Sequence, residues 1–144
     1  MLIANKNKEF PMVKGLAHVC FVVRDLDKAV EFYVDKLGLA MAFEFKHADG
    51  RRYGAYLRAG GRCFIELFQG EVTAGDGKAS FQHICLEVDD IEKTVAELQA
   101  RGVEVGPVTL GCDQSYQAWL ADVDGNKIEL HAYTPDSWQK PHLA

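Results

Sequence analysis

Two histidines and two glutamates recur at matching positions in the two halves of the chain. His83 follows His18 by 65 positions, and the segments around them are similar, Phe-Gln-His-Ile-Cys-Leu against Leu-Ala-His-Val-Cys-Phe. Glu129 follows Glu66 by 63 positions, and each glutamate lies in an Ile-Glu-Leu segment. Two imidazoles and two carboxylates are a suitable ligand set for a divalent metal. The sequence therefore predicts a metal site built from these four residues.

The repetition is what favours a metal site over structural roles for these residues. A lone histidine in a strand is more often a hydrogen-bonded structural residue than a ligand. The presence of both residue types in both repeats reverses that preference, and a divalent cation removes the repulsion between two carboxylates in one cleft. Cys20 and Cys85 are also 65 positions apart. For them a structural role is favoured, because free cysteines fit crowded interiors.

The elements that would position the four residues also occur twice. Each half has the pattern strand, helix, strand, strand, strand, which predicts an α+β fold of two β-α-β-β-β modules. Apolar residues at helical spacing predict helices over 26–37 and 91–98, ended by Gly38 and Gly102. Asp25 or Asp27 caps the first helix and Asp89 or Asp90 the second. The expected strands are 14–24, 39–45, 53–58, 63–68, 81–88, 103–108, 117–121 and 127–133.

Length and composition are consistent with one domain over residues 1–144. We expect a first module over about 14–70, a linker over 71–79, a second module over about 80–135 and a tail over 136–144, which Trp138 could anchor. The net charge of −5 argues against nucleic-acid binding. No apolar run is long enough to span a bilayer and no signal peptide is evident, so a cytoplasmic location is expected.

Strand alternation indicates where the four residues point. Side chains in a strand face opposite sides of the sheet in turn, so His18 and His83 are expected to point away from the helices. Glu66 and Glu129 lie between apolar neighbours and follow the same rule. Glu87 and His131 share these faces and are candidate supporting or substrate contacts. All four predicted ligands can converge if the two halves are related by pseudo-twofold symmetry.

The chain resembles the vicinal oxygen chelate superfamily, the glyoxalase and bleomycin-resistance fold, over roughly residues 14–135. The motifs that carry the resemblance are highly specific for the superfamily and much less specific for one reaction. In the first half they are the segments 16–26, 31–33 and 37–39, and in the second half they are 81–90 and 122–130. The last segment, Asp-Val-Asp-Gly-Asn-Lys-Ile-Glu-Leu, is similar to a family signature that usually has proline at the position of Val123.

The resemblance implies a curved eight-stranded mixed sheet around a metal cleft and a glyoxalase I-like lyase or isomerase. Such an enzyme acts by proton transfer through a chelated enediolate on a small oxo substrate. By this resemblance His18, Glu66, His83 and Glu129 hold one divalent metal, nickel or zinc before cobalt, manganese or iron. Glu129 is the preferred general base and Glu66 the other candidate. A homodimer is expected, with each site built within one chain or across two.

Two departures from bacterial glyoxalase I concern the substrate. Val22 stands where those enzymes carry an arginine that helps hold glutathione, and residues 110–116 replace a Lys-Gly-Gly loop. A glutathione adduct is therefore less favoured than the metal site itself. The alternatives are an extradiol-type dioxygenase, a carbon-acid epimerase, or a non-enzymatic drug-binding module of the bleomycin-resistance kind.

Overall fold

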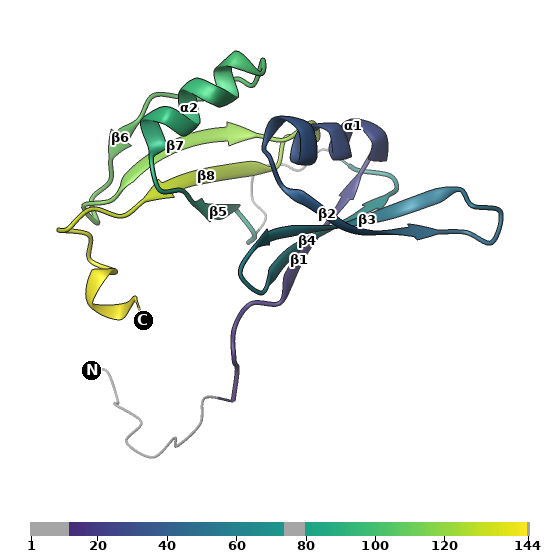
Figure 1. The fold of residues 1–144 in the computed structure, drawn as a ribbon, viewed down its shortest axis with the longest axis horizontal. Coiled ribbons are helices and arrows are strands. Elements are labelled where there is room, and N and C mark those ends of the chain that lie inside the picture. Colours follow the sequence, from purple (N-terminus) through teal and green to yellow (C-terminus); the bar gives the residue numbers. More distant parts are fainter. Residues whose placement is uncertain (1–11, 74–79, 144) are drawn as a thin grey trace.

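Two β-α-β-β-β modules follow one another in the computed structural model, which describes residues 12–73 and 80–143 (Figure 1). The predicted fold class is confirmed. The first module contains β1 (His18–Val23), α1 (Leu26–Val30), η1 (Glu31–Lys36), β2 (Ala40–Lys46), β3 (Arg52–Gly60) and β4 (Cys63–Gln69). The second contains β5 (His83–Glu87), α2 (Ile91–Ala100), β6 (Thr109–Leu110), β7 (Tyr116–Ala121) and β8 (Lys127–Ala132), and the short η2 (Lys140–His142) follows.

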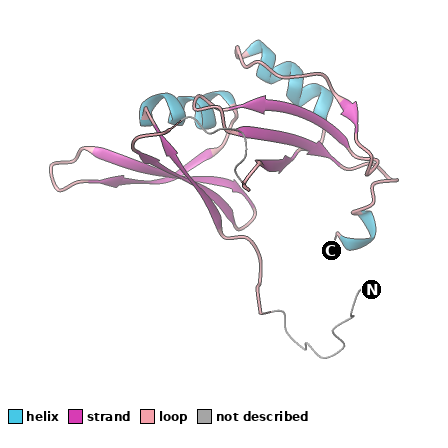
Figure 2. Ribbon diagram, turned by 180° about the vertical axis from the view of Figure 1, so that it is seen from behind, coloured by secondary structure: helices cyan, strands magenta, loops and turns pink. Residues whose placement is uncertain are grey.

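The eight strands form two four-stranded sheets rather than one continuous sheet. Their orders are β1-β4-β3-β2 and β5-β8-β7-β6, so the modules have the same topology. In each module the first strand runs parallel to the fourth, and the other pairs are antiparallel. Figure 2 shows from behind that the two sheets splay apart. Each module therefore presents its own sheet face.

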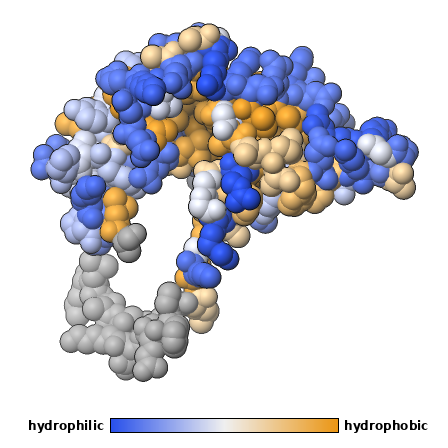
Figure 3. All heavy atoms as spheres, viewed as in Figure 1, coloured by the Kyte–Doolittle hydropathy of each residue, from blue (hydrophilic) through white to orange (hydrophobic). Residues whose placement is uncertain are grey.

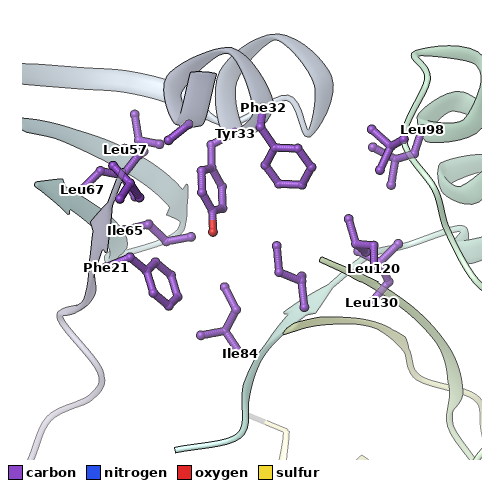
Figure 4. Close-up of a cluster of buried hydrophobic side chains, with 14 of the residues drawn as sticks. Phe21, Phe32, Tyr33, Leu57, Ile65, Leu67, Ile84, Leu98, Leu120 and Leu130 are labelled. Carbon is purple, nitrogen blue, oxygen red and sulfur yellow. The ribbon is translucent and has the colours of Figure 1, made fainter. Parts of the chain in front are cut away.

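A shared hydrophobic core joins the modules on the helical side of the sheets. Tyr33 and Phe21 from the first module lie near Ile84 from the second, and Leu98 packs over Leu120 and Leu130 (Figure 4). Tyr33, Ile65, Leu67, Ile128 and Leu130 are at most 1% exposed. Because burial of apolar surface is the main favourable contribution to folding, this core fixes how the modules are placed relative to each other.

The helices begin where aspartate caps them. Asp25 accepts a hydrogen bond from the Lys28 backbone N–H at 3.1 Å, and Asp90 accepts one from Lys93 at 3.0 Å. The structure thus selects one aspartate from each predicted pair. The first helix widens into the π-helix η1, in which the Leu37 N–H donates to the Phe32 carbonyl oxygen at 2.8 Å. The wider turn lets adjacent aromatic side chains both enter the core.

The Asp-Val-Asp-Gly-Asn segment before β8 is a turn that ties the modules together. The Asp122 carboxylate accepts hydrogen bonds from the backbone N–H groups of Asp124 and Asn126, at 2.9 and 2.8 Å. It also accepts one from the Tyr33 hydroxyl at 2.7 Å. Arg24 forms an ion pair with Asp124 at 3.0 Å. This motif therefore shapes the turn and anchors it to the first module.

Two predicted segments differ from the structure. The strand expected over 103–108 is displaced to β6, because Pro107 has no N–H to donate and only Gly106 bonds to β7 there, through the Trp119 carbonyl oxygen. The tail docks through the Ser137 side chain and the Trp138 backbone N–H, which donates to the Asp113 carbonyl oxygen at 3.0 Å, and not through the Trp138 side chain. Ser137 is 2% exposed and its hydroxyl accepts from that of Ser115 at 2.8 Å, whereas Trp138 is 65% exposed. Most of the predicted linker lies outside the described residues.

The surface has hydrophobic and hydrophilic regions in distinct places. Figure 3 shows apolar residues gathered where the modules meet beneath the helices, with mostly hydrophilic residues over α2 and the far end of the β2–β3 hairpin. In the part of the chain that the structure describes, no helix has the length and apolar character needed to cross a membrane.

Candidate metal centre

Strand alternation places the predicted ligands on the faces expected from the sequence. In β1, Phe21 and Val23 are buried, while His18 and Cys20 on the other face are exposed. In β5, Ile84 is buried while His83 and Cys85 are exposed. The glutamates of β4 and β8 lie between buried apolar neighbours and are only partly buried themselves. Both half-sites therefore open on the side of each sheet away from its helix.

The first half-site consists of His18 and Glu66. The His18 Nε2 lies 3.8 Å from the Glu66 Oε1, and the side chains are 42% and 17% exposed. On the other side of the imidazole, the Tyr56 hydroxyl lies 3.2 Å from the Nδ1. A partner on Nδ1 orients the ring and leaves Nε2 to face a ligand or metal.

The second half-site consists of His83 and Glu129 and is more tightly held. The His83 Nε2 lies 3.1 Å from the Glu129 Oε2. The other carboxylate oxygen, Oε1, lies 3.1 Å from the Nδ1 of His131, which is 7% exposed. Trp119 meets the His83 ring edge-on, with 4.8 Å between the ring centroids. Glu129 is therefore held between two imidazoles.

The structure brings the four predicted ligands together as two pairs. Among the described residues, no ion pair connects His18 or Glu66 with His83 or Glu129. The pairs belong to different sheets, which splay apart in Figure 2. Within one chain these contacts therefore form two separate pairs and not one four-ligand cluster.

Each glutamate lies between a cysteine and an aromatic residue on the neighbouring strands. Glu66 lies opposite Cys20 on one side and Tyr56 on the other. Glu129 lies opposite Cys85 and Trp119 in the same way. Sequence reasoning missed the two aromatic residues, although they are separated by the same 63 positions as the glutamates. That shared offset was the signal that could have identified them.

The next row of side chains differs between the modules. In module 1 (residues 18–69), Phe68 lies between Val22 and Gly54. Gly54 leaves room for the Phe68 ring, because a Cβ at Gly54 would lie 2.6 Å from a ring carbon. In module 2 (residues 83–132) the corresponding residue is His131, between Glu87 and Gln117. The row is apolar in module 1 and polar in module 2.

Burial and the neighbouring carboxylates change the pKa values of the Cys20 and Cys85 thiols. Burial raises the pKa of the Cys20 thiol, and its hydrogen bond to Glu66 and the charge of Glu66 add to this effect. Burial raises the pKa of Cys85 to about 12, together with the charge and hydrogen bond of Glu129. Without a cation both groups are therefore protonated thiols at neutral pH.

Hydrogen bonds join the loop after β6 to the C-terminal tail near the second half-site. Asp113 accepts a hydrogen bond from the Gln139 side-chain amide at 2.6 Å, and one from the Ser115 backbone N–H at 3.2 Å. These bonds lower the pKa of Asp113, and the charge of nearby His131 contributes. The C-terminal residues thus fix an acidic loop near His131.

The donor chemistry of the half-sites fits a divalent transition metal. Imidazole nitrogens and carboxylate oxygens suit zinc, nickel, cobalt, iron and manganese. The separations of 3.1 and 3.8 Å within the pairs are close to those of neighbouring ligands around one ion. Each pair supplies two ligands, so a four-ligand ion requires both pairs at one place.

Comparison with known proteins finds one matching family and several similar sequences. Residues 15–130 match the family described as the Glyoxalase/Bleomycin resistance protein/Dioxygenase superfamily. A probable lactoylglutathione lyase of Synechocystis sp. is 32% identical over 126 residues, which cover 80% of this chain and 92% of the relative. A probable chloroplastic lactoylglutathione lyase of Arabidopsis thaliana is also 32% identical, over 81% of this chain, but the matched region is only 35% of that protein.

Other relatives have different names. The metallothiol transferase FosB of Staphylococcus epidermidis is 27% identical over 124 residues, covering 83% of this chain and 84% of that protein. The crystal structure of TnmS3, an antibiotic binding protein from Streptomyces sp. CB03234, superposes with a TM-score of 0.70 at 26% identity. The match covers 87% of this chain and 100% of TnmS3.

Proposed function

The chain belongs to the glyoxalase/bleomycin resistance protein/dioxygenase superfamily, and we propose that it is a metal-dependent, glyoxalase I-like lyase or isomerase. The observation that carries this proposal is the duplicated His–Glu pair, His18 with Glu66 and His83 with Glu129, on equivalent faces of the two modules. Its relatives named lactoylglutathione lyase support the same reaction class.

The metal site of this proposal is assembled across a homodimer. His18 and Glu66 of one copy meet His83 and Glu129 of a second copy, so each dimer has two sites. Support comes from the separation of the pairs within one chain and from the exposure of both half-site faces. Closed twofold symmetry makes both interfaces equivalent, so both sites form together.

A bound divalent ion, nickel or zinc before cobalt, manganese or iron, would act as a Lewis acid toward two neighbouring oxygens of a small oxo substrate. The protein's own contribution is the positioning of ligands and the movement of a proton. A glutamate carboxylate takes the proton from one carbon and returns it to the adjacent one.

Glu66 and Glu129 are the two candidates for this base, and the contacts favour Glu66. A base that is also a ligand must loosen during turnover. Glu129 is fixed by an imidazole on each oxygen, whereas Glu66 has one imidazole at 3.8 Å and the Cys20 thiol. The family resemblance favours Glu129 as the base, and the contact between Glu129 and His131 reverses that preference.

Metal analysis and a turnover assay test this function. The purified protein should carry at least one divalent ion per chain and isomerise the hemithioacetal of a small 2-oxoaldehyde with at least one thiol. Glutathione should be compared with other low-molecular-weight thiols, because Val22 places an exposed apolar side chain at the end of β1. A metal-loaded, folded protein inactive with every thiol would contradict the proposed reaction.

A drug-binding module is the second candidate, favoured by the similarity to the antibiotic binding protein TnmS3. Its distinguishing property is ligand binding that does not need the duplicated His–Glu pairs. A folded protein that purifies without metal, and that binds an antibiotic equally well after His18→Ala and His83→Ala, would favour this function.

A further inference from the structure

Three donor groups of different chemistry gather within module 2. The Cys85 thiol lies on β5 opposite Glu129 on β8, and His131 lies two residues further along the same face of β8. One donor atom from each, the Cys85 Sγ, a Glu129 oxygen and a His131 ring nitrogen, lie within 4.8 Å of one another. Among the residues that the structure describes, this is the one such group of three or more.

One pair of these donor atoms is about as close as neighbouring ligands in a tetrahedral zinc site. Metal–ligand bonds of about 2.0–2.3 Å place neighbouring ligands roughly 3.3–3.7 Å apart. The His131 Nδ1 and the Glu129 Oε1 are already 3.1 Å apart. The Cys85 Sγ also lies within 4.8 Å of the Glu129 and His131 donor atoms.

The surroundings suit a bound ion. His131 is buried and packs edge-on against Tyr133, so its ring is held in place. Cys85 is exposed, which leaves an open side for the ion to enter and for water to complete the coordination. Thiolate and imidazole ligands favour zinc or cobalt over magnesium or calcium. On binding, the Cys85 thiol releases its proton to solvent.

Module 1 provides an internal comparison. Cys20 and Glu66 occupy the positions of Cys85 and Glu129, but Phe68 stands where module 2 has His131. Module 1 therefore has two donors of this kind and lacks the third. The same fold thus presents a three-donor group in only one of its two halves.

We propose that Cys85, Glu129 and His131 form a thiolate-containing site for a zinc-like ion within a single protomer. It uses the Glu129 oxygen that faces His131, while the other oxygen faces His83. The site does not depend on the proposed isomerase activity or on a dimer, because all three ligands come from one chain.

Cobalt titration of the His18→Ala protein tests this site, because that change removes a ligand from the proposed four-residue site and leaves module 2 intact. A thiolate-to-cobalt charge-transfer band should appear and saturate at one ion per chain. Cys85→Ser in this background should abolish the band, and the matched Cys20→Ser should leave it unchanged. His131→Phe, which copies Phe68, should weaken cobalt binding by at least about tenfold.

Several outcomes would overturn the site. They are the absence of the band from a folded His18→Ala protein, a band that survives Cys85→Ser, and a band that disappears with Cys20→Ser. Weaker metal binding in His131→Phe without any thiolate band would show that His131 only orients Glu129, which also contradicts the proposal. His131→Asn, whose amide is similar in shape, is the substitute variant if the phenylalanine variant does not fold.

Discussion

Module 1 and module 2 share a topology, a His–Glu pair and a cysteine beside the glutamate, yet they hold their glutamates differently. Glu129 has an imidazole on each carboxylate oxygen, at 3.1 Å in both cases. Glu66 has one imidazole at 3.8 Å. The second imidazole comes from the next row of the sheet, which contains His131 in module 2 and Phe68 in module 1. Both modules have the His–Glu pair, and they differ in the contacts that hold the glutamate.

This contrast suggests a division of labour in the proposed enzyme. A firmly held carboxylate is a good permanent ligand, and a loosely held one can leave the metal to move a proton. Module 2 then provides the fixed part of the site and module 1 the mobile part.

Removing the two carboxylates should have the largest effect and should separate their roles. Glu66→Gln is expected to lower kcat roughly 10²- to 10⁴-fold with metal content largely kept, because it removes the base. Glu129→Gln should weaken metal binding as well. Steady-state kinetics and metal analysis of both variants check this. A Glu66→Gln protein with near-normal kcat would identify Glu129 as the base.

Placing a histidine beside Glu66, at the position that His131 has beside Glu129, should have a smaller effect on turnover. Phe68→His gives Glu66 a second imidazole, and turnover should fall about tenfold, because a hydrogen bond to a charged group contributes roughly 1.5–3 kcal/mol. Metal affinity, measured by calorimetry, should stay equal or rise. The control is Phe68→Leu, which adds no donor. An equal loss of turnover in both variants would mean that packing against Gly54 is what matters.

The smallest effect is expected where the modules are joined. Tyr33→Phe removes the hydroxyl that donates to buried Asp122 and should lower the free energy of unfolding by about 1–2 kcal/mol. Tyr53→Phe, at an exposed position in the same module, is the matched control and should change it little. Urea denaturation measures both. Equal stability of Tyr33→Phe and wild type would argue against this tie between the modules.

The sequence predicted the repeated elements well because strand alternation and helical spacing are local properties. The faces of His18, Glu66, His83 and Glu129 followed directly from Ile-Glu-Leu and His-x-Cys alternation. The separation of the two pairs could not be predicted, since it depends on how the modules pack through Tyr33 and its neighbours. The displaced strand β6 shows the same limit, as pairing there is decided by Pro107 and β7.

The central claim, that half-sites from two copies form one metal site, is tested most directly by mixing subunits. One inactive protein carries His18→Ala and Glu66→Ala, and the other carries His83→Ala and Glu129→Ala. After unfolding and refolding together, the mixture should recover about a quarter of wild-type activity. Half of randomly formed dimers are mixed, and each mixed dimer has one complete site and one without ligands. No recovery, from a mixture shown to contain mixed dimers, would contradict a shared site.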